Sequence, residues 1–429
     1  MELKEKVATG LEQVRARSLG LLDPVPEEDQ LCQHSPLMSP LVWDLAHVGN
    51  FEELWLLRVV ASHPSTSDEF DDMYNPFVHP RFDRATLPLL GPREARTYIS
   101  EVRGRALDVL EDIDLDPSDP ILDQGYVYGM VIQHEHQHDE TMLATLQLRQ
   151  TGAYPLHELP LPGSAGRLTE EVLVEGGSSI TGTDLEPWAY DNERSAHVVE
   201  LSSFWIDTTP VTNAAFQEFV EQGGYDDRVL WSEAGWAWRC SGSVRAPEFW
   251  SCEGEGSWAR RRYGQVEALP DLEPVQHVCY HEAEAYARWR GKRLPTEIEW
   301  EKAASWHPSG RKLRFPWGDD EPTSELANLG QRHWRPAPVG AYPAGVSPWG
   351  CHQMVGDVWE WTSSDFVPYP GFTSFPYPEY SEVFFGGDYK VLRGGSWATH
   401  PSAIRNTFRN WDDPTRRQIF AGFRCARDA

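Results

Sequence analysis

The sequence GMVIQHEHQHDETMLATLQL, residues 129–148, decides the fold of the first part of this chain. Its apolar residues recur at the spacing of an amphipathic helix. At about 100° per residue, His134 and His138 lie one turn apart on the same face, whereas His136 points to nearly the opposite side. Two imidazoles one helical turn apart can bind one metal ion. We therefore expect His134 and His138 to be metal ligands and His136 to lie outside the site.

Three more segments near the N-terminus have the apolar periodicity of helices, and a fourth contains the histidines. The expected helices are residues 2–22, 40–61, 92–112 and 118–150. Ser118 or Asp119 is a suitable cap for the last of them, and residues 62–91 form a long connection. Four amphipathic helices with one long connection predict an all-α four-helix bundle over residues 1–150.

His47 is the candidate for a third ligand. It lies in LVWDLAHVGNFEELW, residues 41–55, on the second expected helix, and bundle cores receive ligands from facing helices. We expect His47 to complete a site with His134 and His138; two exposed or capped histidines are the alternative for the pair alone. Three imidazoles suit Zn, Cu, Fe or Ni, so the ligand types leave the metal open. We do not expect a zinc-protease site here.

Carboxylates near the histidines are candidate partners for the second nitrogen of each ring. Asp139 and Glu140 follow the pair, and Asp44 lies about one turn before His47. A carboxylate that holds the other nitrogen of a metal ligand commonly changes metal affinity by about 10–100-fold. We expect Asp44 to contact His47, with a surface charge as the alternative.

Composition and charge exclude several classes of function. The chain has 429 residues, 40% of them hydrophobic, and a formal net charge of -28 at pH 7. Without a strong basic block, we expect no nucleic-acid-binding surface. The N-terminus lacks the apolar core of a signal peptide, and no run approaches the ~20 apolar residues of a membrane span. The six cysteines are scattered without a close CxxC pair, which indicates a reducing compartment, and we expect a monomeric cytoplasmic protein.

The second part of the chain has a different composition. Only Trp43 and Trp55 of the 19 tryptophans precede residue 188, and residues 151–167 are rich in proline and glycine, as in a linker. Residues 168–429 contain short β-like runs such as HVVELSSFWID and KVLRGG. Two helices are expected near residues 212–221 and 281–291. This pattern predicts a multidomain protein whose second domain is α+β with much irregular structure.

Several strings in both parts resemble known families. Those of the second part are DNERSAHVVELSSFWIDTTPVTNAAFQEFV (191–220), GKRLPTEIEWEKAA (291–304), MVGDVWEW (354–361), VLRGGSW (391–397) and GFRCAR (422–427). They resemble the formylglycine-generating-enzyme or sulfatase-modifying-factor fold, a C-type-lectin-like domain, and the DLAH and HxxxHDET strings of the first part resemble DinB-like metal-binding bundles. With HPRFDRATLPLL, FPYPEYSEVFFG and RNWDDPTRRQIFAGFR, essentially the whole chain is similar to the ergothioneine-biosynthetic sulfoxide synthases.

The resemblance implies a non-heme iron(II) enzyme. Such an enzyme uses O2 to join the thiol of γ-glutamylcysteine to the imidazole C2 of hercynine, which is trimethylhistidine, and leaves the sulfur as a sulfoxide. Formylglycine formation is the rival for the second domain, and that chemistry needs a reactive cysteine pair after the GGS turn. GGSWATHPSAIRNTFRN, residues 394–410, contains no cysteine, and Thr399 and Ile404 occupy the approximate cysteine places.

The resemblance also implies one site built from residues of both domains. Tyr377 is the expected proton donor for O2 reduction, because a phenol with its ordinary pKa near ~10 is protonated at neutral pH. Tyr380 is either the donor or a hydrogen-bonding neighbour, and an aromatic that only packs is the alternative for each. For hercynine, Asn410 can donate to the carboxylate and Trp411 can face the trimethylammonium group through a cation–π contact of roughly 0.5–2 kcal/mol. Gln137 can hydrogen-bond the imidazole or its water, with an exposed helix residue as the alternative.

Recognition of γ-glutamylcysteine requires cations for two carboxylates and an anion for one ammonium group. Arg84, Asp412 and Arg416 match the recognition positions of the family, and Arg81 and Arg417 are close enough in sequence to remain alternatives. Surface ion pairing, which contributes little, is the other interpretation. Free cysteine stays open as the thiol. A DinB-like metal-dependent thiol transferase without O2 chemistry and a non-catalytic ligand-binding protein are the competing functions.

Overall fold

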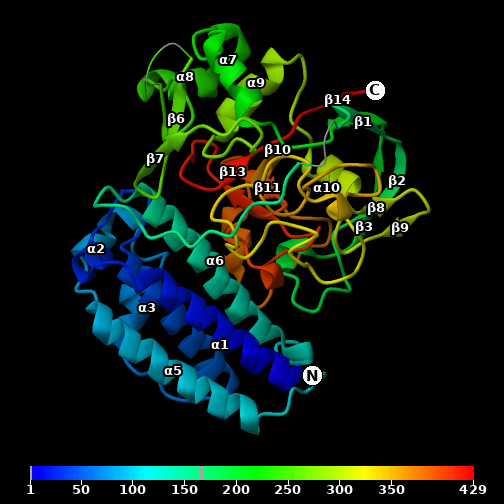
Figure 1. The fold of residues 1–429 in the computed structure, drawn as a ribbon. Helices are drawn as coiled ribbons and strands as arrows, with labels where there is room; N and C mark the ends of the chain where they lie inside the picture. Colours follow the sequence, from blue (N-terminus) through cyan, green and yellow to red (C-terminus); the bar gives the residue numbers. More distant parts are fainter. Residues whose placement is uncertain (1, 165–167, 253, 255) are drawn as a thin grey trace. The chain divides into compact units, whose positions relative to one another are not determined.

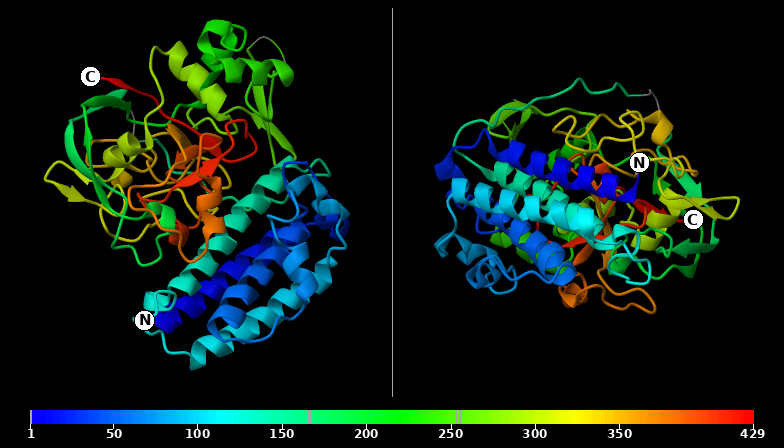
Figure 2. Two further views of the ribbon diagram at one scale, coloured as in Figure 1. Left: turned by 180° about the vertical axis from the view of Figure 1, so that it is seen from behind. Right: turned by 90° about the horizontal axis from the view of Figure 1, so that it is seen from below.

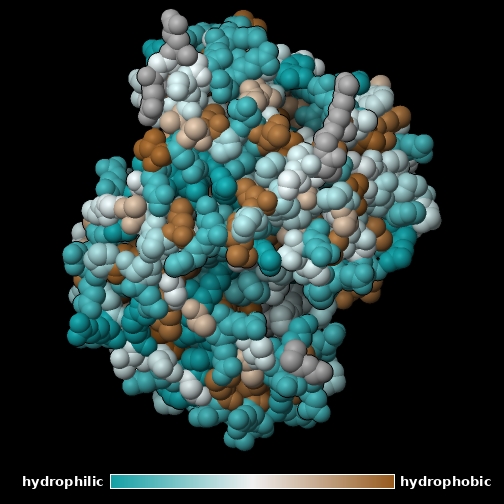
Figure 3. All heavy atoms as spheres, viewed as in Figure 1, coloured by the Kyte–Doolittle hydropathy of each residue, from teal (hydrophilic) through white to brown (hydrophobic). Residues whose placement is uncertain are grey.

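The computed structural model describes residues 2–164, 168–252, 254 and 256–429. The chain divides into two compact units, Met1–Pro155 and Leu156–Ala429 (Figure 1). The first unit is helical and the second combines small sheets with short helices. Hydrophilic side chains cover most of the face shown in Figure 3, in keeping with the strongly acidic composition. Among the described residues, no helix combines the length and the apolar character that crossing a bilayer requires.

The first unit is the expected four-helix bundle, whose long helices run side by side in both views of Figure 2. Its long helices are α1 (Leu3–Leu22), α3 (Leu41–Glu52), α5 (Pro92–Asp112) and α6 (Tyr126–Leu148). A π-helical turn, η1 (Glu53–Val60), continues α3. The connections contain α2 (Glu27–Leu31), α4 (Asp68–Met73), η2 (Arg81–Thr86) and η3 (Asp123–Gly125). Helix α3 packs on both α5 and α6. His47, on α3, therefore lies close to the helix that carries His134 and His138.

The start of α6 differs from the expectation. The helix begins at Tyr126 and not directly after Ser118 or Asp119. The Asp119 carboxylate accepts a hydrogen bond from the backbone N–H of Ile121 at 3.0 Å, so it caps a turn instead. Gly125 then interrupts the backbone at φ 69°, a left-handed conformation that helices do not continue through.

The second unit confirms the predicted α+β class. This unit contains a three-stranded sheet in the order β1-β4-β14 and a four-stranded sheet in the order β12-β11-β10-β13. The second of these carries the expected site residues Asn410, Trp411 and Asp412 on β12. The strands of the two sheets are β1 (Glu171–Val174), β4 (Phe204–Asp207), β14 (Ala426–Asp428), β12 (Asn410–Asp412), β11 (Lys390–Arg393), β10 (Trp359–Asp365) and β13 (Ala421–Gly422). β10 runs antiparallel to β11 and parallel to β13.

Smaller elements surround these sheets. The remaining strands are β2 (Gly177–Thr181), β3 (His197–Leu201), β5 (Trp250–Cys252), β6 (Trp258–Arg262), β7 (Gln265–Ala268), β8 (Trp306–His307) and β9 (Arg311–Lys312). The helices are α7 (Asn213–Glu221), α8 (Glu233–Ser241), α9 (Tyr280–Trp289) and α10 (Glu297–Ser305). α7 and α9 match the two expected helices, whereas α8 and α10 were not predicted from the sequence.

The core of the second unit has ionised groups embedded in it. Glu297, at the start of α10, binds the Arg409 guanidinium with two contacts of 2.8 and 2.9 Å, and both residues are buried. Glu360 on β10 binds Arg424 in the same two-pronged way at 2.7 Å for each contact. Pairs of this geometry give up little hydrogen-bonding capacity on burial. They join the C-terminal segments, which carry several expected site residues, to the middle of the domain.

Candidate metal centre

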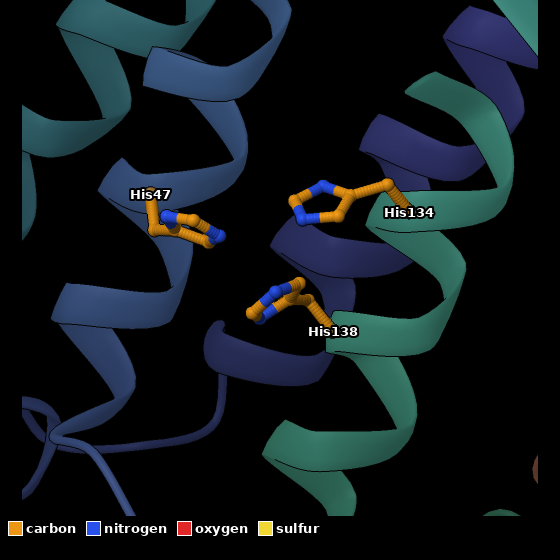
Figure 4. Close-up of side chains that lie close together, drawn as sticks. All are labelled: His47, His134 and His138. Atoms are coloured by element: carbon orange, nitrogen blue, oxygen red, sulfur yellow. The ribbon is translucent and has the colours of Figure 1, made fainter. Parts of the chain in front are cut away.

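Three histidines from two helices meet in the first unit. Figure 4 shows the rings of His47, from α3, and of His134 and His138, from α6, pointing toward one another. One ring nitrogen of each lies within 4.8 Å of the others. The ring centroids of His47 are 5.1 Å from His134 and 4.6 Å from His138, and those of His134 and His138 are 4.6 Å apart. A group of this size can surround one metal ion.

Two of the three rings are held by an acceptor at Nδ1. His47 Nδ1 lies 2.7 Å from the carbonyl oxygen of Tyr74, and His138 Nδ1 lies 3.0 Å from Asp44 Oδ1. A carbonyl oxygen only accepts, so Nδ1 of His47 carries the proton and its Nε2 keeps the lone pair that a metal requires. The expected contact between Asp44 and His47 is therefore wrong. The carbonyl of Tyr74 occupies that position, and the Asp44 carboxylate reaches across to α6.

The third ring is held differently. His134 stacks on Phe51, with centroids 3.8 Å apart and planes at 19°. Its Nδ1 is buried and has no hydrogen-bond partner within the part of the chain that the structure describes. His47 also stacks on an aromatic ring, that of Trp43, at 4.8 Å and 11°. Packing, rather than a second hydrogen bond, thus orients His134.

The protonation of these rings suits a metal cation. Burial lowers the pKa of His47 and of His134 well below the ordinary value, and the neighbouring His138 lowers both further. Neutral imidazole is the form that binds a metal. A set of three imidazole nitrogens fits a divalent transition metal, and iron(II) is among the metals that imidazole suits.

The opposite face of α6 contains a buried ionic cluster, the "Glu135 cluster", formed by Glu135 with Arg15, Glu52 and Arg103. Arg15 Nε lies 2.7 Å from Glu135, and Arg103 Nη2 lies 2.9 Å from it. Both arginines also bind Glu52, at 2.7 and 2.5 Å. Although burial alone would raise the pKa of Glu135, the two arginines hold it at about 2.

The Glu135 cluster excludes a zinc-protease function for the HEHQH stretch. The stretch satisfies the HExxH spacing of zinc proteases, with Glu135 in the place of the general base, so spacing alone does not exclude that chemistry. The direction of Glu135 does exclude it. Its carboxylate is 1% exposed and is bound to arginines on the face away from the three histidines.

Asp139 and His136 belong to the same buried face. Asp139 accepts a hydrogen bond from Ser18 at 2.7 Å and lies 3.3 Å from Nδ1 of His136. Burial raises the pKa of Asp139 to about 7. The expectation that Asp139 contacts a ring of the histidine pair is therefore wrong. At 100° per residue, Asp139 lies on the side of the helix away from His134 and His138. His136 is buried there too, on the side of the helix that its spacing predicts.

Arg84 lies close to this centre, although its sequence position is distant. Its guanidinium carbon is 3.7 Å from the ring centroid of Trp43, the residue that stacks on His47. Arg84 is 5% exposed and donates to Ser39 at 2.7 Å and to the carbonyl of His79 at 2.9 Å. Burial lowers its pKa to about 10, with Asp44 opposing the shift. Arg81, the alternative, is half-buried and donates to the carbonyl of Leu37.

The expected residues of the second unit also lie near one another. Tyr380 meets Tyr377 edge-on, with ring centroids 6.4 Å apart, and meets Trp411 edge-on at 5.8 Å. Trp411 is on β12, between Asn410 and Asp412, and one of its faces is stacked by Phe366 at 4.1 Å. A cation–π contact to hercynine therefore requires the other face of Trp411.

The two adjacent arginines of this region have different surroundings. Arg416 lies 3.4 Å from Asp412, in a partly exposed pair. Arg417 binds the buried Glu282 and also Glu248, each at 3.0 Å. Arg417 is thus part of the domain core, which favours Arg416 as the recognition residue. Gln137, in the first unit, is half-buried on α6.

The sequence places Trp43 and either Asn50 or Phe51 on the face of His47, but it did not predict their stacking on the histidine rings or the Tyr74 carbonyl. Trp43 and Phe51 each lie four residues from His47 along the chain, so helical spacing contains a signal for both. The carbonyl of Tyr74 has no such signal, because any residue of the long connection offers the same group.

Comparison with known proteins matches both units. Residues 158–429 match the family described as sulfatase-modifying factor enzyme 1-like domain, and residues 10–142 match the DinB superfamily. A formylglycine-generating enzyme of Streptomyces coelicolor is 34% identical and covers 63% of this chain and 93% of its own length. These matches confirm the two fold assignments made from the sequence.

Two relatives match over the full length. A protein of Mycolicibacterium thermoresistibile named hercynine oxygenase is 51% identical, over 99% of this chain and 95% of its own. A protein of Mycolicibacterium smegmatis with the same name is 50% identical, over 100% of both chains. The match to oxygenases disfavours the thiol transferase and the non-catalytic binding protein. The chain is an oxygenase and belongs to the hercynine oxygenase family.

Proposed function

We propose that this enzyme uses iron(II) and O2 to join hercynine and γ-glutamylcysteine, giving γ-glutamyl-hercynylcysteine S-oxide, a step of ergothioneine biosynthesis. The reaction balances with one O2: the thiol and the imidazole C2 each lose a hydrogen, one oxygen stays on sulfur and the other leaves as water. The observation that carries the proposal is the group of three histidines with ring nitrogens within 4.8 Å of one another, in a chain 51% identical to a hercynine oxygenase.

His47, His134 and His138 would hold the iron. When bound there, iron(II) supplies the redox chemistry toward O2 and a Lewis-acid site for the thiol. The protein ligands are neutral, so none of them competes with an anionic thiolate for the charge of the metal. The Asp44 carboxylate is engaged by Nδ1 of His138 and so orients a ligand instead of replacing one.

Tyr377 would deliver the proton that the oxygen leaving as water requires, with Tyr380 as its aromatic neighbour. A phenol is protonated at neutral pH and can donate. The expected consequence of Tyr377→Phe is a lower kcat with a smaller change in the KM for hercynine. If instead binding of hercynine collapses while each bound complex turns over normally, Tyr377 is a recognition residue.

Arginines and aromatic residues would select the two substrates. Arg84 and Arg416 suit the carboxylates of γ-glutamylcysteine, and Asp412 suits its ammonium group. Asn410 and Trp411 would receive the carboxylate and the trimethylammonium group of hercynine, and Gln137 its imidazole. All six cysteines are free, which supports a reducing, cytoplasmic setting, and we propose a monomer.

The oxygenase proposal is tested with the full-length protein loaded with iron(II) or with zinc. Product formation from hercynine and γ-glutamylcysteine is followed by mass spectrometry in air and under anaerobic conditions. We expect the sulfoxide only with iron and O2. Undiminished formation of the C–S bond without O2, or with zinc alone, would show thiol transfer in place of oxygenation.

The choice of thiol is tested in the same assay. We expect kcat/KM for γ-glutamylcysteine to exceed that for free cysteine, because the larger thiol offers a second carboxylate to the arginines. Arg416→Gln should narrow this difference, and Arg245→Gln, at an exposed arginine of the same unit, is the matched control. Equal kcat/KM values for both thiols in the unaltered enzyme would assign free cysteine as an equal substrate.

A further inference from the structure

A single carboxylate holds both ends of the segment that carries Tyr377 and Tyr380. This "tyrosine segment", residues 375–381, has the sequence FPYPEYS. Asp191 Oδ2 accepts a hydrogen bond from the backbone N–H of Phe375 at 3.2 Å, and Asp191 Oδ1 accepts one from the hydroxyl of Ser381. The two oxygens of Asp191 therefore close the segment into a loop.

A second buried side chain completes the contact at Ser381. The amide nitrogen Nδ2 of Asn192 donates to the Ser381 hydroxyl oxygen at 3.0 Å. The hydroxyl thus donates to one neighbour and accepts from the other. Ser381 and Asn192 are both 0% exposed, and Asp191 is 2% exposed. Three polar side chains buried together in this way are costly unless their hydrogen bonds remain made.

The group that holds the tyrosine segment is itself fixed to the core of the domain. Asp191 and Asn192 begin a short 3-10 helix, η4 (Asp191–Glu193). Arg409 donates to the carbonyl of Asn192 at 2.9 Å. Arg405 Nε donates to Glu193 at 2.8 Å. A displacement of η4 would therefore break buried charge-assisted bonds, so this helix can serve as a rigid reference for the segment.

The tyrosine segment has little regular structure of its own. Pro376 and Pro378 flank Tyr377, and a proline has no N–H to give to a strand ladder. Only a short 3-10 turn, η7 (Pro378–Tyr380), lies within it. The ring of Tyr380 stacks on Tyr190, the residue before η4, with centroids 4.0 Å apart and planes at 18°. The contacts with residues 190–192 thus link this segment to the buried core.

We infer that Asp191 and Ser381 are positioning residues that hold Tyr377 and Tyr380 in place for the oxygenase reaction. The inference rests on the proposed role of these tyrosines. Neither Asp191 nor Ser381 is proposed to touch a substrate. Their effect on the reaction passes through the orientation of the two phenol rings.

Ser381→Ala removes the hydroxyl that bridges Asp191 and Asn192. We expect kcat for sulfoxide formation to fall about tenfold, the equivalent of one buried hydrogen bond. The KM for the thiol and the iron content should change less than twofold, because the iron ligands are in the other unit. Thr373→Ala, which removes an exposed hydroxyl just before the segment, is the matched control and should leave kcat unchanged.

A double-mutant cycle distinguishes positioning from an independent effect. If Ser381 acts through Tyr377, the variant with Ser381→Ala and Tyr377→Phe should be about as slow as Tyr377→Phe alone. The same cycle is run with Tyr380→Phe, and non-additivity with either tyrosine supports the inference. Additive losses with both overturn it. If neither Tyr→Phe variant loses kcat, the proposed role of the tyrosines fails, and any loss in Ser381→Ala then has another cause.

Hydrogen exchange tests the contact without any activity. In the full-length protein, Ser381→Ala and Asp191→Asn should each speed amide exchange in a peptide covering residues 372–385. Peptides from α6 should be unchanged. Asp191→Asn keeps one acceptor oxygen, so its effect should be the smaller of the two. Unaltered exchange at residues 372–385 in both variants would show that Asp191 does not hold the segment.

Discussion

The two faces of α6 both carry buried titratable side chains, but these side chains have different partners. On one face, His134 and His138 point with His47 to a common centre, and the Asp44 carboxylate lies at Nδ1 of His138. On the other, Glu135 lies in a cluster with two arginines and a second glutamate, all buried. In the Glu135 cluster each charge faces opposite charges, whereas His47 and His134 are neutral rings that can offer nitrogen lone pairs to a metal.

The difference follows from the cost of burying charge. A buried carboxylate is tolerable only when cations and hydrogen bonds compensate it, so the Glu135 cluster is closed to any further ligand. Buried imidazoles avoid this cost by staying neutral, as the lowered pKa of His134 shows. One helix can therefore stabilise the bundle with one face and bind a metal with the other. The following predictions test that separation, from the largest expected effect to the smallest.

His47→Ala removes the one ligand that comes from another helix. We expect the purified, iron-reconstituted variant to lose its iron and its oxygenase activity. Iron is measured by metal analysis and the fold by circular dichroism. His136→Ala, on the opposite face, is the control and should keep its iron. Normal iron content in His47→Ala would remove this residue from the ligand set.

Glu135→Gln leaves two buried guanidinium groups with incomplete compensation. We expect the free energy of unfolding of the bundle to fall by about 3–5 kcal/mol, the usual cost of breaking a buried ion pair. Urea unfolding of the iron-free protein, followed by circular dichroism, measures this loss. Glu101→Gln, at an exposed position of α5, should change stability by less than about 0.5 kcal/mol. Equal effects from the two substitutions would contradict the importance of the cluster.

Asp44→Ala removes the acceptor at Nδ1 of His138. We expect iron(II) affinity to weaken by about 10–100-fold, as measured by competition with a chelator. Asp44→Asn should recover part of the loss, since its oxygen still accepts although the charge is gone. Asp139→Asn is the control from the other face, and its iron affinity should be close to that of the unaltered protein. A similar loss in Asp139→Asn would mean that the two faces are not separate.

Phe51→Leu removes the ring that stacks on His134. Because His134 has no hydrogen bond at Nδ1 among the described residues, this stack is the contact that orients it. We expect a loss of about 0.5–1.5 kcal/mol in iron binding, the smallest effect of the series. Phe82→Leu, at a side chain that is 62% exposed, should have no effect. If Phe51→Leu binds iron as tightly as the unaltered protein, the helix backbone alone orients His134.

Much of the bundle and the identity of the histidine group could be predicted from the sequence. Helical periodicity placed His134 and His138 on one face and His136 on the other, because an angle of 100° per residue holds for any regular helix. The apolar periodicity of residues 40–61 placed His47 on a second helix. The strings around residues 191–220 and 391–397 indicated the second fold, which the family matches confirm.

The partners of those side chains could not be predicted in the same way. Asp44 was expected to contact His47, but it contacts His138. Which histidine Asp44 reaches depends on how α3 crosses α6 and not on spacing within either helix. Arg416 and Arg417 look alike in sequence. Only the structure shows that Arg417 is committed to Glu282. The link from Asp191 to Ser381 joins residues 190 positions apart, for which local patterns contain no signal.

The sequence by itself determined the four long helices of the bundle, the direction of each histidine around its helix and the family of the chain, since these depend on local geometry and residue type. The tertiary structure decided which acceptor orients each ring and which carboxylates are neutralised by arginine. These are contacts between elements distant in sequence, and burial sets their strength. The HEHQH stretch shows both the local and the tertiary contribution. Its spacing allows a protease glutamate, and the arginines around Glu135 rule that role out.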